Sequence, residues 1–109
     1  MKDEKLYLIH ISECIGRIES YTNKLSKDAF MKSDMVQDAV VRNLQIMSES
    51  TQRLSEKTKQ TQPQIDWFKI VGFRNVLVHD YLGIDPEKIW NIIQKELPTL
   101  KMAVSEMMR

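Results

Sequence analysis

Two side chains suited to phosphate chemistry, Arg74 and His79, stand five positions apart in the C-terminal half of the chain. A guanidinium can hold two phosphoryl oxygens at once, and an imidazole can accept or release a proton near neutral pH. On an ideal helix these two side chains point about 140° apart, whereas Asn75 lies one turn before His79 on the same face. Because an arginine side chain is long enough to reduce that gap, the three residues can serve one phosphodiester group.

Arg74 also admits a purely structural role. It falls in an apolar stripe with Trp67 and Val71, where an unpaired guanidinium would cost roughly several kcal/mol. A buried ion pair with Glu49 or Glu56 would remove that cost. The residue pattern alone leaves both roles open.

The elements that must position these residues are helices. Apolar residues recur at helical spacing along almost the whole chain, and no segment alternates as a half-buried strand does, which predicts an all-α fold. Helices are expected over residues 3–25, 34–59 and 67–79, and from residue 86 past residue 104. The expected inward positions are Leu8, Ile11, Ile15, Ile18 and Leu25 in the first helix, Val36, Val40, Leu44, Met47 and Leu54 in the second, and Trp90, Ile93, Leu97, Leu100 and Val104 in the last.

Local signals mark where these helices begin and where one is disturbed. Ser33 or Asp34 can cap the second helix, Asp66 the third, and Asp85 the last. Pro98 has no N–H to donate and its ring would clash with a carbonyl one turn earlier. The sequence therefore predicts a kink or a break in the last helix.

The predicted helix over residues 67–79 is apolar on nearly every side, with Lys69 as its only ordinary surface residue. A helix of this kind is usually surrounded by protein, and a chain of 109 residues has little protein with which to surround it. A second copy would supply the cover. We therefore expect a homodimer formed mainly through this helix.

Charge and composition exclude several classes of protein. The 16 basic and 15 acidic side chains give a net charge of +1, which encodes no general attraction to nucleic acid or to anionic membranes. The three glycines form no glycine-rich loop of a nucleotide-binding type. The length predicts one domain over residues 1–109.

Cysteine usage and the apolar runs predict a cytoplasmic chain. Cys14 is the only cysteine, so no intrachain disulfide can form. The apolar stretch at residues 6–11 is short and interrupted by His10, which predicts neither a signal peptide nor a membrane span. His10 and Cys14 lie one turn apart, but no second pair with ligand spacing follows, and we expect neither a metal site nor a cofactor.

The string RNVLVHDY at residues 74–81 resembles the Arg-x4-His-x-Tyr motif of HepT-like toxins, members of the HEPN superfamily of metal-independent ribonucleases. The resemblance covers most of the chain and is strongest from about residue 36 onward. It extends to Pro63, Trp67, LGID at residues 82–85, Trp90 and LP at residues 97–98. One departure lies on the second predicted helix, where many relatives carry a Gly-Glu pair and residues 47–50 read MSES.

The resemblance implies an antiparallel bundle of four to five helices that forms a homodimer, with the motif helices of the two copies facing each other. It also implies that Arg74 and His79 are catalytic and that Asn75 is the polar residue that usually follows the arginine. The implied substrate is RNA, cleaved by its own 2′-hydroxyl. Such cleavage needs a proton acceptor, a proton donor and a cation at the phosphate, which these residue types provide.

Tyr81 has two interpretations. A tyrosine just past a helix end commonly covers the core with its ring. The resemblance instead implies that the phenol accepts AMP from MntA, a minimal nucleotidyltransferase that acts as the antitoxin, in a complex that can be larger than the dimer. The alternatives are a non-catalytic helical dimer that serves as substrate or regulatory subunit of a nucleotidyltransferase, and a helical bundle that holds a small ligand.

Overall fold

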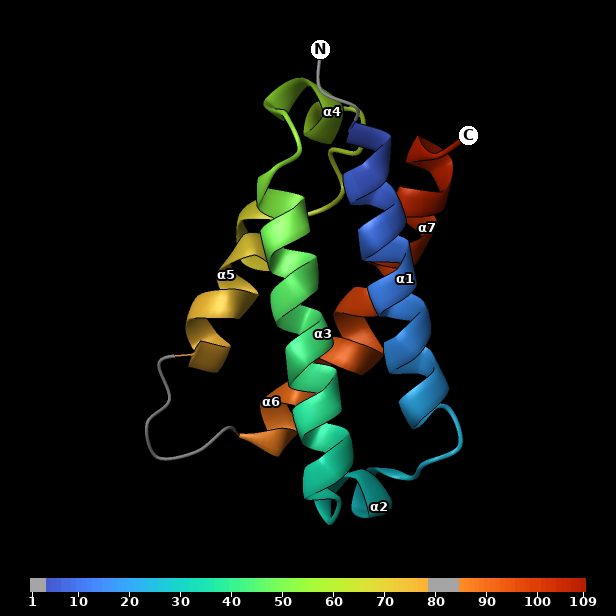
Figure 1. Ribbon diagram of the computed structural model, residues 1–109, viewed down its shortest axis with the longest axis vertical. Helices are drawn as coiled ribbons and strands as arrows, with labels where there is room; N and C mark the ends of the chain where they lie inside the picture. Colours follow the sequence, from blue (N-terminus) through green and yellow to red (C-terminus); the bar gives the residue numbers. More distant parts are fainter. Residues whose placement is uncertain (1–3, 79–84) are drawn as a thin grey trace.

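Helices make up the regular secondary structure of the described part of the chain (Figure 1). The computed structural model describes residues 4–78 and 85–109, and of residues 74–78 it describes only the backbone. The elements are α1 (Glu4–Thr22), α2 (Lys27–Met31), α3 (Asp34–Gln52), α4 (Glu56–Gln60), α5 (Trp67–Val78), α6 (Pro86–Asn91), the π-helical turn η1 (Ile92–Glu96) and α7 (Leu97–Met107). The all-α prediction is confirmed, and two short helices, α2 and α4, come in addition to the expected ones.

The long helices run antiparallel in chain order (Figure 1). Helix α3 packs against α1 on one side and against α5 on the other, and α7 packs against α1. The start of α1 and the end of α7 lie at the same end of the bundle. In residues 4–78 and 85–109, none of the helices combines the length and apolar character that a membrane crossing requires.

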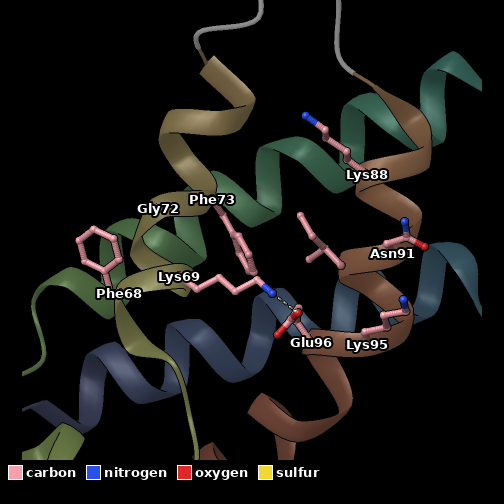
Figure 2. A pocket seen from close by; sticks show the side chains of 9 residues that line it. Phe68, Lys69, Gly72, Phe73, Lys88, Asn91, Lys95 and Glu96 are labelled. Carbon is pink, nitrogen blue, oxygen red and sulfur yellow. Dashed lines mark hydrogen bonds and ion pairs between the residues drawn. The ribbon is translucent and has the colours of Figure 1, made fainter.

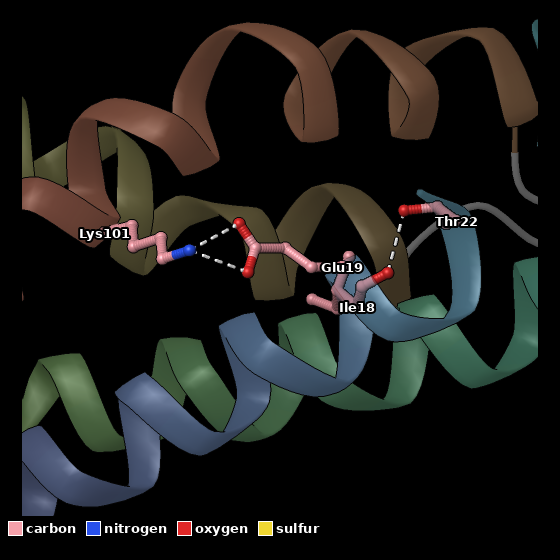
Figure 3. Close-up of polar contacts among 4 residues, drawn as sticks. All are labelled: Ile18, Glu19, Thr22 and Lys101. Carbon is pink, nitrogen blue, oxygen red and sulfur yellow. Dashed lines mark hydrogen bonds and ion pairs between the residues drawn. The ribbon is translucent and has the colours of Figure 1, made fainter. Parts of the chain in front are cut away.

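The core between these helices contains most of the predicted inward residues. Fully or almost fully buried are Leu8, Ile11, Ile15, Ile18, Val40, Leu44, Met47, Leu54, Ile93, Leu97, Leu100 and Val104. Val36 and Trp90 are half-buried, and the Trp90 ring lies 5.2 Å from that of Phe30, centroid to centroid. On the surface, Lys101 of α7 donates to both carboxylate oxygens of Glu19 of α1 at 3.0 and 3.1 Å (Figure 3).

The first helix is shorter than predicted. It ends at Thr22, whose hydroxyl donates to the carbonyl of Ile18 at 2.8 Å (Figure 3). Ser26 then caps a separate helix, α2, by accepting the N–H of Ala29 at 3.1 Å. Leu25, expected in the buried stripe, lies in the connection instead and is half-buried. The prediction for Leu25 was wrong because a local cap starts a new helix just after it.

The second helix is also shorter than predicted, ending at Gln52 rather than near residue 59. Its predicted start is confirmed, because the hydroxyl of Ser33 accepts the N–H of Val36 at 3.2 Å. Ser55 caps the short helix α4 that follows, and Glu4 holds this cap by accepting the Ser55 N–H at 2.7 Å. That hydrogen bond keeps the pKa of Glu4 below its usual range. The hydrogen bond between Ser55 and Glu4 therefore helps to start a new helix where the apolar periodicity predicted one continuous helix.

Pro98 disturbs the last helix as predicted, and the disturbance is a π turn. The Leu97 N–H donates to the carbonyl of Ile92, five residues earlier, and Pro98 follows in the first turn of α7. Since a proline has no N–H for the carbonyl one turn before it, the wider turn accommodates the ring without ending the rod. Helices α6 and α7 therefore form one continuous rod through η1.

Candidate active site

Helix α5 carries the first residues of the predicted motif, and its start is held by several contacts. The carboxylate of Asp66 accepts the N–H of Lys69 at 3.1 Å, which confirms the predicted cap. The indole N–H of Trp67 points back to the preceding loop and donates to the carbonyls of Lys59 at 3.0 Å and Gln62 at 3.2 Å. The helix therefore begins from a fixed position against the segment that follows α4.

A buried hydrogen bond ties α5 to α3 near the motif. The hydroxyl of Ser48, which is 1% exposed, donates to the backbone carbonyl of Ile70 at 3.0 Å. In an α-helix the carbonyl of Ile70 also pairs with the N–H of Arg74, four residues on. The tether therefore fixes the turn of α5 that leads directly into Arg74.

This role of Ser48 was not predicted from the sequence. The residue lies on the inner face of α3 beside Met47 and Thr51, both fully buried. A hydroxyl in such surroundings needs a hydrogen-bond acceptor, and Thr51 finds one in its own helix, at the carbonyl of Met47. The signal was the MSES string at residues 47–50, which places a hydroxyl on the inner face of α3.

The structure describes the predicted catalytic residues only in part. The backbone of Arg74 and Asn75 lies within α5, one turn after Ile70. Outside the described part of the chain are the side chains of Arg74 and Asn75 and the whole of His79 and Tyr81. Their meeting at one phosphate and the AMP-acceptor role of Tyr81 stay predictions.

The buried face of α5 differs from the expected one. Ile70 and Phe73, each 3% exposed, are its most buried described residues, whereas Trp67 and Val71 of the expected stripe are half-buried. Phe68 is 89% exposed, so the part of α5 described here is not covered on every side. The ion pair of Arg74 with Glu49 or Glu56 stays a prediction; both of these glutamates are on the exposed surface.

A groove of about 530 Å³ runs between α5 and the rod formed by α6 and η1 (Figure 2). Its α5 wall consists of Phe68, Lys69, Gly72 and Phe73, and its other wall of Lys88, Asn91, Ile92, Lys95 and Glu96. The Phe73 side chain points into the space between the two walls, and Phe68 projects outward from α5 (Figure 2). The groove is therefore largely apolar inside, with charged groups along its edge.

One ion pair joins the two walls. Lys69 donates to the carboxylate of Glu96 at 2.7 Å (Figure 2). This hydrogen bond to Glu96 raises the pKa of Lys69 above its usual value. Glu96 is the only acidic residue that lines the groove within the described part of the chain, and this contact compensates its charge.

Comparisons with known proteins place the chain in a family. The ribonuclease HepT-like family matches residues 11–107. The chain belongs to this family. The matched range includes α5, both walls of the groove and the whole of the Arg74–Tyr81 string.

Several relatives of this HepT-like chain are known by name. It is 35% identical over 107 residues to the "Gamma-glutamylcyclotransferase and putative RNase" of Methanocaldococcus jannaschii, which corresponds to 98% of the chain and 48% of that longer protein. The chain thus spans about half the length of this relative. It is 31% identical over 100 residues to the "Probable ribonuclease HepT" of Thermococcus cleftensis, covering 92% of the chain and 91% of that protein. No solved structure matches the chain significantly.

The described residues of this HepT-like chain show no cluster that could hold a metal ion, taking three or more His, Cys, Asp or Glu side chains as a cluster. Cys14 is 1% exposed, and burial raises the pKa of its thiol. A protonated, buried thiol behaves as a small apolar group, so Cys14 belongs to the core.

Proposed function

We propose that this HepT-like chain is a cytoplasmic, metal-independent endoribonuclease, the toxin of a toxin–antitoxin pair. The family match over residues 11–107 and the ribonuclease names of its relatives support the activity. The observation that carries the proposal is the tether between Ser48 and Ile70, because it holds the turn of α5 that precedes Arg74. A rigidly held cation is what phosphoryl transfer requires.

In the proposed reaction, His79 takes the proton of the 2′-hydroxyl next to the scissile phosphate. The 2′-oxygen then bonds to phosphorus, the bond from phosphorus to the 5′-oxygen breaks, and a proton is returned to that departing oxygen. Arg74 contacts two phosphoryl oxygens while negative charge builds up on them, and Asn75 orients the substrate or His79 by hydrogen bonding. The products are a 2′,3′-cyclic phosphate and a 5′-hydroxyl.

We further propose that two copies pair through α5, which brings two sets of Arg74, Asn75 and His79 together. Ile70 of α5 is buried and its carbonyl accepts the hydroxyl of Ser48 of α3, while Val71, which does not line the groove, is half-buried in the single chain. A two-fold interface on this helix would cover its remaining apolar side. Light scattering at micromolar protein concentration would contradict this part of the proposal if it shows a monomer.

The test of the activity is cleavage of RNA by the purified chain in excess chelator. We expect cleavage to persist and to leave 2′,3′-cyclic phosphate ends, and His79→Ala to lower the rate by about 10² to 10⁴. Loss of cleavage in chelator, or unchanged cleavage by His79→Ala, would overturn the mechanism. A wild-type chain that never cleaves RNA would favour the non-catalytic alternative, a helical dimer that serves a nucleotidyltransferase.

The proposed control of the toxin acts at Tyr81, two residues after His79. Transfer of AMP to the phenol by an MntA-like nucleotidyltransferase would add negative charge and bulk beside a site that must accept an RNA phosphate. Tyr81→Phe retains the ring and lacks the acceptor oxygen, so it should cleave RNA and escape the antitoxin. An AMP-sized mass increment on Tyr81→Phe after co-expression would place the acceptor elsewhere.

A further inference from the structure

We propose that the groove between α5 and the α6–η1 rod binds single-stranded RNA next to the scissile phosphate, with Phe68 stacking on a base and Lys88 and Lys95 contacting phosphates. This inference rests on the proposed ribonuclease function and adds a substrate subsite to it. The three residues lie on the two walls of one groove of about 530 Å³.

The exposed aromatic ring of Phe68 indicates a flat ligand. Phe68 is 89% exposed although it lies on a helix whose neighbours Ile70 and Phe73 are each 3% exposed. Single exposed apolar side chains are common on protein surfaces, and it is the place of Phe68 on the wall of a groove that also holds two lysines that indicates a ligand. A nucleobase has a flat face that stacks on such a ring, and this contact tolerates any base sequence.

The charges along the groove indicate a polyanion. Lys69 and Glu96 compensate each other across the two walls at 2.7 Å. Lys88 and Lys95 line the same groove, and neither has an ion-pair partner among the described residues. A second copy of this chain has a net charge of +1 and would not compensate these two lysines. RNA carries one negative charge per nucleotide and would compensate them.

The place of the groove in the chain connects it with the motif. Phe73 of its α5 wall immediately precedes Arg74, and Lys88 lies on α6, the helix that follows the motif segment. The two walls therefore flank the predicted catalytic residues on both sides in the sequence. Residues 79–84 join the two walls in the chain, so an RNA strand whose phosphate reaches His79 would extend its neighbouring nucleotides along this groove.

The test measures RNA binding in the slowly cleaving His79→Ala chain, so that binding is judged apart from cleavage. The probe is a fluorescein-labelled single-stranded RNA of about twelve nucleotides, followed by fluorescence anisotropy at several salt concentrations. The double variant Lys88→Ala/Lys95→Ala should reduce the slope of log K against log salt by about 1.4, the value for two lost phosphate contacts on a single strand. Phe68→Ala should weaken binding about tenfold, and Phe68→Tyr, which keeps the aromatic face, should bind as the parent does.

The matched control is Lys24→Ala/Lys32→Ala, which removes the same charge from exposed positions outside the groove. A slope change as large in this control as in the groove variant would overturn the proposal, because the effect would then be one of total charge. Unchanged binding by the groove variants would overturn it as well. So would dissociation of a dimer by Phe68→Ala in light scattering, since the groove would then be an interface between copies. If the groove variants lose binding while the wild-type chain cleaves no RNA, the subsite stands and the proposed activity fails.

Discussion

The α1–α3 pair and the groove beside α5 use apolar residues in opposite ways. In the pair, Ile11 and Leu44 are 0% exposed, and the buried hydroxyl of Thr51 has an acceptor. At the groove, Phe68 is 89% exposed. The seam between α1 and α3 buries its own apolar residues, although Leu6 and Met35 are exposed elsewhere on these helices, whereas the groove holds apolar surface that the described chain leaves uncovered. The difference teaches that apolar character in a small helical protein has two meanings, core formation and contact with another molecule.

The largest expected difference between the two regions is in the free energy of unfolding of their truncation variants. Leu44→Ala should lower it by about 3 to 5 kcal/mol, because the change opens a cavity in a fully buried site. Phe68→Ala should change it by less than about 0.5 kcal/mol, since an exposed side chain loses little on truncation. Urea unfolding of both variants measures the difference. Similar losses in the two would mean that Phe68 is part of the core in solution.

Ser48→Ala tests whether the tether between the two regions positions the motif. It should lower stability by about 1 kcal/mol and the cleavage rate about tenfold, because α5 loses its bond to α3 next to Arg74. Thr51→Val is the matched control, since it removes a buried hydroxyl bonded only within α3. We expect it to cost similar stability with cleavage unchanged. Equal cleavage by both variants would leave Ser48 with a purely structural role.

The hydrogen bonds that Glu4 of α1 accepts make the free energy of unfolding depend on pH in the acidic range. The folded pKa of Glu4 lies below the unfolded value of 4.5, so its contribution is present above that pH and is lost as pH falls through the folded pKa. Glu4→Gln should therefore reduce stability by about 1 kcal/mol or less at pH 7, where the exchange weakens hydrogen bonds to Ser55 and Thr58. The urea midpoints of variant and wild type should lie closer together at a pH below 4.5 than at pH 7. A constant gap at both pH values would contradict the role of the charge.

The smallest expected effects come from two exposed ion pairs, one between α1 and α7 and one across the groove. Lys101→Ala removes the pair with Glu19, and Lys69→Ala removes the pair with Glu96. Each should cost less than about 0.5 kcal/mol of stability, as exposed pairs do. Only Lys69→Ala leaves an uncompensated carboxylate in the groove, so only this variant should weaken RNA binding. Equal RNA affinity of the two variants would mean that RNA does not contact the groove.

Sequence reasoning succeeded where a contact is local. The caps at Ser33, Asp66 and Asp85 each bind an N–H two or three residues ahead, within reach of a short motif. It went wrong over residues 53–59, because the cap at Ser55 is held by Glu4, 51 positions away in the chain. Packing, not periodicity, decides such long-range contacts.

In the candidate site as well, local patterns were visible in the sequence and long-range contacts were not. The RNVLVHDY string was visible in the sequence, and the structure assigns its first residues to α5. The tether from Ser48 to Ile70 joins residues 22 positions apart, and the groove pair of Lys69 and Glu96 joins residues 27 apart. Neither pairing follows from spacing within one helix. A single sequence therefore indicates which side chains can react, while the fold decides what holds them.

The π turn at Ile92–Glu96 has a consequence for how such a groove can arise. A π turn is a helix that has accepted one extra residue, and one residue corresponds to about 100° of rotation about the helix axis. Deleting a single residue there would remove the wide turn that accommodates the Pro98 ring, and it would turn α6 by about a quarter of a revolution relative to α7. Lys88 would swing away from Phe73, and Trp90 away from Phe30. A single insertion or deletion at this turn therefore decides which side chains of α6 face the α5 wall of the groove.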